Sequence, residues 1–121
     1  MSTILIVDDS PENIDVLGHI LKKHNVKVAL NGKKALEIAN SSSRPDLIFL
    51  DIMMPDMDGF DVCRKLKSNE NTKDIPVIFV TAKNNPGDKA KGLNLGAVDY
   101  ILKPIRADII LTSVQEYLKD I

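Results

Sequence analysis

Five short, nearly continuous apolar runs recur along the chain, each separated from the next by a longer segment of helical character. The runs span Ile4–Val7, Val26–Leu30, Leu47–Leu50, Val77–Val80 and Tyr100–Leu102. A strand with one exposed face alternates apolar and polar residues, whereas a continuous apolar run indicates burial on both faces, as in a parallel sheet covered by helices. Only the second run, which contains Lys27, has the polarity expected of an edge strand.

The segments between the runs predict five helices. Ser10 is the predicted N-cap of the first helix, Pro11 occupies its first position, and Asn25 is its predicted end. The other four are predicted at Lys33–Asn40, Asp58–Ser68, Pro86–Leu95 and Arg106–Asp120.

Alternation of five strands with five helices predicts one α/β domain over residues 1–121. Right-handed crossovers between parallel strands place the helices on both faces of one open, doubly wound sheet. In such sheets, ligands bind beyond the carboxyl ends of the strands. Residues that directly follow a strand are therefore the candidates for chemistry.

Composition and charge narrow the classes of function. The chain has 121 residues, of which 44% are hydrophobic, and a formal net charge of −1. This balance disfavours binding to nucleic acid or to an anionic membrane. No apolar run approaches the roughly 20 residues of a membrane span, and no signal-peptide pattern precedes Asp8. The only cysteine, Cys63, is predicted to face the core and to be inert, so a soluble, unprocessed cytoplasmic domain is expected.

Polar groups follow four of the five predicted strands. Asp8 and Asp9 follow the first run, Asp51 the third, Thr81 the fourth and Lys103 the fifth. Two carboxylates ~4 Å apart repel by about 4 kcal/mol at an effective dielectric constant near 20, so a cation must offset them. A site of oxygen ligands without His or Cys favours Mg²⁺ over zinc, and Mg²⁺ shares its remaining positions with phosphate oxygens.

Among these groups, Asp51 is placed to attack phosphorus and form an acyl phosphate. In this hypothesis Mg²⁺ binds one phosphoryl oxygen, Lys103 a second, and Thr81 with nearby backbone amides a third. The sequence has no glycine-rich nucleotide loop, so the phosphoryl group is expected from a partner or a small donor. Each residue alone has an ordinary interpretation as a helix cap or surface charge, and their convergence on one rim favours the chemical one.

Other side chains with chemical potential are given no role. His19 and His24 lie on or just after the first helix and are predicted to be solvated. Met53, Met54 and Met57 are predicted to fill gaps beside the sheet.

Four segments resemble those of the receiver domains of two-component response regulators. They are, in order, Ile4–Ser10, Asp51–Gly59, Pro76–Ala82 and Gly96–Pro104. The resemblance covers essentially the whole chain. It implies the flavodoxin-like strand order 2-1-3-4-5 and a signalling switch that catalyses only its own phosphorylation and dephosphorylation.

The resemblance also implies roles for the acidic residues. Asp51 is expected to be the phosphoacceptor, and Asp9 and Asp51 are expected to bind Mg²⁺ directly. Asp8 would act through water and the Met53 carbonyl oxygen would complete the protein ligands, with Mn²⁺ able to substitute. Met53 and Lys83 would flank the phosphoryl group and tune its hydrolysis.

Further roles concern the opposite side of the phosphoryl group. By resemblance, Thr81 and Lys103 bind it, and a cis peptide bond between Lys103 and Pro104 directs the ammonium to the site. Tyr100 resembles the switch aromatic, whose ring moves inward when Thr81 is drawn towards the phosphoryl group.

The resemblance names partners as well. The phosphoryl group would come from a histidine of a sensor kinase or of a histidine phosphotransfer protein. The surface of the fourth helix, the fifth strand and the fifth helix would be recognised by an output domain, a partner protein or a second copy in a phosphorylation-dependent dimer.

Two other functions use the same residues differently. Hydrolases of the haloacid dehalogenase type also use an aspartate nucleophile and Mg²⁺, but their signature is Asp-x-Asp on the first strand, where this chain has adjacent Asp8 and Asp9 and no cap domain. The other alternative is an interaction module that works without phosphorylation. Mg²⁺ titration distinguishes it from a phosphoacceptor, because a receiver domain that is not phosphorylated in function is expected to bind the ion weakly or not at all.

Overall fold

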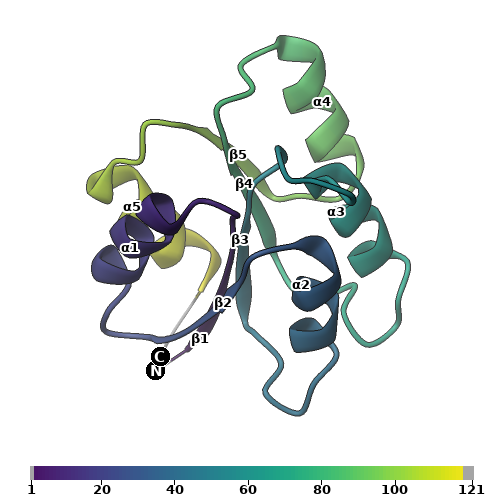
Figure 1. The fold of residues 1–121 in the computed structure, drawn as a ribbon, viewed down its shortest axis with the longest axis horizontal. Coiled ribbons are helices and arrows are strands. Elements are labelled where there is room, and N and C mark those ends of the chain that lie inside the picture. The colour runs from purple at the N-terminus through teal and green to yellow at the C-terminus, as the bar shows by residue number, and fades with distance from the viewer. Residues whose placement is uncertain (1, 119–121) are drawn as a thin grey trace.

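The structure, a computed structural model, describes residues 2–118 and holds one parallel sheet between two layers of helices (Figure 1). The strands are β1 (Thr3–Val7), β2 (Asn25–Ala29), β3 (Leu47–Leu50), β4 (Val77–Thr81) and β5 (Asp99–Leu102). The helices are α1 (Pro11–Ile20), α2 (Gly32–Ala39), α3 (Gly59–Lys67), α4 (Pro86–Asn94) and α5 (Ala107–Tyr117). The strand order is β2-β1-β3-β4-β5, and all four neighbouring pairs are parallel. The predicted fold class and strand order are confirmed.

Two apolar cores flank the sheet, one on each face. Figure 1 shows α1 and α5 on one side and α2, α3 and α4 on the other. Along β1 the side chains alternate between them: Ile4 packs with Leu17 and Ile110 on the α1 and α5 side, and Leu5 belongs to the other core with Phe60. This two-sided burial explains the continuous apolar runs, because neither face of the inner strands meets water.

The two edges of the sheet differ in how well their sequences mark them. β2 is one edge, as the polar Lys27 predicted, and β5 is the other, which its apolar run did not indicate. Tyr100 and Ile101 are buried in opposite cores, and Leu102 is 47% exposed. Helix cover on both faces therefore hides this edge from the hydropathy pattern.

Polar caps begin most of the helices. The Ser10 hydroxyl accepts a hydrogen bond from the Asn13 amide at 3.5 Å, with Pro11 at the first helical position, as predicted. Asn31, Asp58 and Asn85 cap α2, α3 and α4 in the same way. The last helix is described as far as Tyr117, and its predicted end at Asp120 lies outside the described residues.

The end of the first helix was predicted wrongly. Helix α1 ends at Ile20, and Asn25 instead begins β2, where its amide donates to the Ser2 carbonyl at 2.9 Å. Between them a turn is closed by the His24 amide, which donates to the Leu21 carbonyl at 2.9 Å. That turn holds His24 against the protein and buries its Nδ1 atom, which has no hydrogen-bond partner among the described residues. The sequence predicted a solvated His24, and this prediction is wrong for the Nδ1 atom.

Of the three methionines near the site, two fill gaps and one does not. Met54 is buried and Met57 packs against the larger core, as predicted, whereas Met53 is 56% exposed. Met53 lies between Ile52 and Met54, whose side chains both turn inward, so its own side chain is left facing outward.

Cys63 is fully buried, and its burial gives a testable consequence. Desolvation raises the pKa of its thiol from 9.0 to about 11. The positive charges of Lys67 and Arg64 lower this pKa, but by less than burial raises it. A disulfide reagent at pH 8 is expected to leave the folded protein unmodified and to label it after unfolding. Because the folded pKa is the higher one, this thiol's contribution to stability is complete below pH 9 and is lost as the pH rises towards 11. Between pH 9 and pH 11 the unfolding free energy of Cys63→Ala, measured by denaturant titration, should fall less than that of the wild type. An equal fall in the two proteins would contradict this account.

Candidate functional site

Four strand ends meet at one edge of the sheet. Parallel strands β1 and β3 are neighbours, and β4 and β5 follow in order, so their carboxyl ends lie on the same rim. Asp8 and Asp9 follow β1, and Asp51 follows β3. Thr81 is the last residue of β4, and Lys103 is the first residue after β5. The structure brings Asp8, Asp9, Asp51 and Lys103 together at this rim. Thr81 lies on the same rim, and among the described residues its hydroxyl forms a hydrogen bond with the Lys83 amide and with none of these four.

Three carboxylates form the centre of this rim. One oxygen from each of Asp8, Asp9 and Asp51 lies within 4.8 Å of the others. Asp8 and Asp51 are buried, with 2% and 5% exposure, while Asp9 is exposed and makes no hydrogen bond or ion pair in the part of the chain that the structure describes. Two desolvated carboxylates this close require a compensating cation.

The Lys103 ammonium supplies one positive charge to the cluster. Its Nζ donates to Asp8 Oδ2 and to Asp51 Oδ2, both at 3.0 Å. Burial lowers the Lys103 pKa, but the hydrogen bonds and charges of the two aspartates outweigh it and hold the pKa above its usual value. The peptide bond between Lys103 and Pro104 is cis. One ammonium among three carboxylates leaves an excess of negative charge at the rim.

Backbone amides fix the orientation of both buried carboxylates. Asp51 Oδ1 accepts from the amides of Ile52 at 2.7 Å and Met53 at 3.4 Å. Asp8 Oδ1 accepts from the Ser10 amide at 2.9 Å. Each of these carboxylates therefore uses one oxygen for the backbone and offers the other to Lys103.

A second polar chain runs from Thr81 to Tyr100 through the backbone of Lys83. The Thr81 hydroxyl, fully buried, accepts from the Lys83 amide at 3.3 Å, and the Tyr100 hydroxyl donates to the Lys83 carbonyl at 2.7 Å. The Tyr100 ring is buried against Phe79, with ring centroids 5.9 Å apart. Burial raises the Tyr100 pKa, and Asp88 and Asp51 add to that shift. The sequence did not predict that Lys83 links Thr81 to Tyr100, because the contacts are made by its main chain and do not depend on the type of its side chain.

Gly59 is another residue whose contribution sequence reasoning did not find. Its amide donates to the Ile52 carbonyl at 2.9 Å, and a Cβ atom there would overlap the Asp51 carbonyl oxygen and lie 2.7 Å from the Ile52 Cα. The start of α3 thus lies directly against the backbone that carries Asp51. A glycine immediately after a capping aspartate, where helix geometry requires none, was the available signal.

The protein-family model of the response regulator receiver domain matches residues 4–115 of this chain. The chain belongs to the response regulator receiver domain family. A curated relative, the response regulator PleD of Caulobacter vibrioides, is 46% identical over 104 residues, which are 84% of this chain and 23% of PleD. Protein PilH of Pseudomonas aeruginosa is 39% identical and covers 98% of both chains. The first relatives are longer proteins, of which this receiver domain spans about a quarter.

Solved structures agree with the family and its fold. The receiver domain of the sensor histidine kinase PA1611 from Pseudomonas aeruginosa, a crystal structure with a magnesium ion coordinated in its active site cleft, is 29% identical, with a TM-score of 0.88 and 98% coverage of both chains. Receiver domains of response regulators are signalling switches that work with histidine kinases and output domains. In the part of the chain that the structure describes, no helix is long and apolar enough to cross a membrane.

The carboxylates of Asp8, Asp9 and Asp51 fit Mg²⁺, the metal that the receiver domain family binds in an acidic pocket. The three side chains that could bind a metal all offer carboxylate oxygens. Among the described residues, the exposed Asp9 carboxylate makes no hydrogen bond or ion pair. Hard divalent cations prefer such oxygen ligands. The excess negative charge left by Lys103 points the same way.

Proposed function

We propose that residues 1–121 form a phosphoacceptor switch that takes a phosphoryl group onto Asp51. The observation that supports this most is the contact of Lys103 with both buried aspartates, because it gathers a nucleophile, a cation and a metal-binding pair at one rim. The donor is a phosphohistidine of a sensor kinase or phosphotransfer protein, or a small acyl phosphate. An Asp51 carboxylate oxygen attacks phosphorus, the bond from phosphorus to the donor breaks, and an acyl phosphate forms.

Asp9, Asp51 and the Met53 carbonyl oxygen would hold Mg²⁺, or Mn²⁺ in its place, with Asp8 acting through water. When bound, this ion offsets negative charge on the phosphoryl oxygens and on the aspartates. Lys103, which now bridges Asp8 and Asp51, would donate to a second phosphoryl oxygen, and the Thr81 hydroxyl would donate to a third.

Phosphorylation would be communicated through the chain of contacts at Lys83. If Thr81 turns its hydroxyl to the phosphoryl group, it releases the Lys83 amide, and the same residue holds Tyr100 through its carbonyl oxygen. Tyr100 and Leu102 also line a hollow of about 230 Å³ beside the start of α4, so the surface of α4, β5 and α5 would report the change to an output domain or a second copy. Inverting a 1:99 population needs about 5.5 kcal/mol, which a few charge-assisted hydrogen bonds approach.

Intact-mass analysis tests the proposal directly. Incubation with Mg²⁺ and a small acyl phosphate donor should add one phosphoryl group, and removing the ion with a chelator should prevent it. No adduct in the presence of Mg²⁺ would overturn the proposal. Broadening of amide signals by Mn²⁺ around Asp9 and Met53 serves as an independent check, because a module that acts without phosphorylation should bind the ion weakly or not at all.

Met53 and Lys83 are expected to set the lifetime of the phosphorylated state. The Met53 side chain is exposed, and the Lys83 ammonium lies 3.8 Å from the Asp88 carboxylate. The resemblance to receiver domains implies that Met53 and Lys83 flank the phosphoryl group. Met53→Ala and Lys83→Ala should change the rate of adduct loss severalfold, since both alter the access of water. Neither should change Mg²⁺ affinity; decay rates equal to that of the wild type would refute this role.

A further inference from the structure

Positive charge is concentrated in one part of the chain. Residues 22–44 carry six Lys and Arg and one acidic residue, Glu37, whereas the rest of the chain carries ten basic and sixteen acidic residues. This segment contains the turn before β2, the edge strand β2 and the helix α2, and we call the outer surface of these three the basic edge. Its lysines are Lys22, Lys23, Lys27, Lys33 and Lys34.

The lysines of the basic edge are almost free of carboxylate partners. Among the described residues, Lys34 alone of the five pairs with one, at 3.9 Å from Glu37, and both side chains of that pair are more than half exposed. An exposed pair of this length contributes little. The positive charge of the basic edge is therefore available to a partner.

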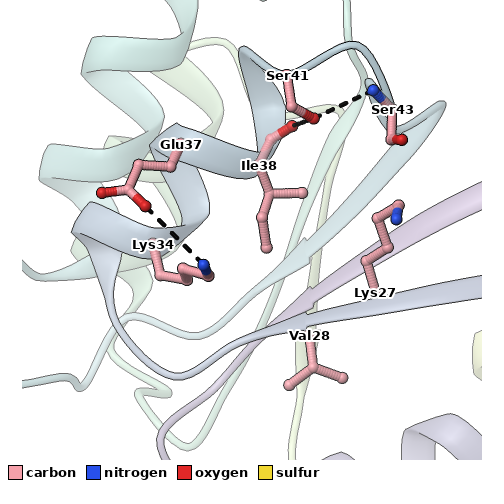
Figure 2. A pocket seen from close by; sticks show the side chains of 7 residues that line it. All are labelled: Lys27, Val28, Lys34, Glu37, Ile38, Ser41 and Ser43. Carbon is pink, nitrogen blue, oxygen red and sulfur yellow. Dashed lines mark hydrogen bonds and ion pairs between the residues drawn. The ribbon is translucent and has the colours of Figure 1, made fainter.

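A hollow of about 440 Å³ lies between β2 and α2 on this edge (Figure 2). Lys27 and Val28 of β2 line it together with Lys34 and Ile38 of α2. In Figure 2 the side chains of Lys27 and Val28 extend from opposite sides of β2, with that of Lys27 on the side of α2. Val28 is 38% exposed. The two faces of the edge strand therefore differ in character: the face beside α2 is basic and the other is apolar.

The backbone of β2 is also unpaired on its outer side. The Asn25 amide donates to the Ser2 carbonyl, and the Ala29 carbonyl accepts from the Asp8 amide, so the groups of Asn25, Lys27 and Ala29 face β1. In a parallel pair, alternate residues face opposite sides, so the amide and carbonyl of Val28 face outward. Among the described strands, β1 is the only neighbour of β2.

We propose that the basic edge binds an extended acidic segment of a partner protein, which adds to β2 as a further strand. Backbone hydrogen bonds to an edge strand give affinity, and alternate side chains give specificity. Acidic side chains of the segment would lie beside Lys27 and Lys34, and its apolar side chains beside Val28. A second copy of this chain is a poor occupant, because pairing two such edges would bring their lysines together.

Fluorescence anisotropy with a labelled peptide of four Glu-Val repeats tests the proposal. This peptide should bind more tightly than a peptide of four Lys-Val repeats and than one of two Glu-Glu-Val-Val repeats, which has the same composition without the alternation. Its affinity should fall as salt is raised, because the contacts are charged. No preference for the alternating acidic peptide would overturn the proposal.

Two variants separate charge from strand pairing. Lys27→Glu combined with Lys34→Glu should weaken binding by about tenfold or more, because two attractions become repulsions. Its control is Lys65→Glu, at an exposed lysine of α3 that is not part of the basic edge. Val28→Pro removes an outward amide and no bond to β1, so it should also abolish binding, while Val28→Thr should retain it. All four proteins should still accept the phosphoryl group, which shows that they are folded.

The remaining outcomes each contradict the proposal. Equal loss in Lys65→Glu would indicate a diffuse electrostatic effect, and retention in Val28→Pro would indicate a contact without strand addition. Tighter binding to single-stranded DNA than to the peptide would indicate a polyanion surface, and a dimer in sedimentation that Val28→Pro abolishes would indicate self-association.

Discussion

Asp51→Asn is expected to abolish the phosphoryl adduct while leaving the fold intact. The amide oxygen of Asn keeps the acceptor for the Ile52 amide, but an amide does not attack phosphorus to give an acyl phosphate. Lys103 still has Asp8 as an ion-pair partner at 3.0 Å, so the buried ammonium is not left alone. Intact-mass analysis should show no adduct, and thermal unfolding should remain cooperative.

The matched control is Asp56→Asn, which removes an exposed carboxylate from the same loop outside the acidic cluster. It should accept one phosphoryl group like the wild type. If Asp51→Asn keeps the adduct, a different residue is the acceptor, and if both variants lose it, the loop rather than the nucleophile has been disturbed.

The inner strands were predictable from the sequence because their environment is uniform. β3 matches its predicted range, and β1 and β4 differ from theirs by one terminal residue, since helices cover both faces and leave no polar position to blur the pattern. The end of α1 was not predictable in this way. Its last turn passes into a short connection whose residues are as polar as the helix surface, so Asn25 resembled a stop and is instead the first residue of β2.

The candidate site was predictable because parallel strands bring their carboxyl ends to one rim. That rule alone selected Asp8, Asp9, Asp51, Thr81 and Lys103. Which atoms are engaged depends on backbone groups that every residue type possesses, such as the amide and carbonyl of Lys83. The sequence therefore indicates which side chains converge, and the structure adds how they are held.

Gly59→Ala should be the most destabilising of the small substitutions considered for this protein. A Cβ atom at Gly59 would lie 2.7 Å from the Ile52 Cα and 2.9 Å from the Asp51 carbonyl carbon, and both are backbone atoms that cannot rotate away. We expect a loss of about 3 kcal/mol or more, the upper part of the usual range for overpacking. For a domain of this size that corresponds to a fall in Tm of about 10 °C.

Gly18→Ala is the control for glycine replacement in general. Gly18 lies within α1, and a Cβ atom there meets nothing within 4 Å, so alanine should stabilise the protein by about 0.5–1 kcal/mol through the backbone entropy of the unfolded state. Because the backbone that would have to move at Gly59 carries Asp51, the Gly59→Ala protein should also be phosphorylated more slowly at a temperature where it is still folded. Equal Tm values for the two variants would show that α3 can move away from the β3 end without cost. A normal phosphorylation rate in Gly59→Ala would show that the contact stabilises the fold and does not position the nucleophile.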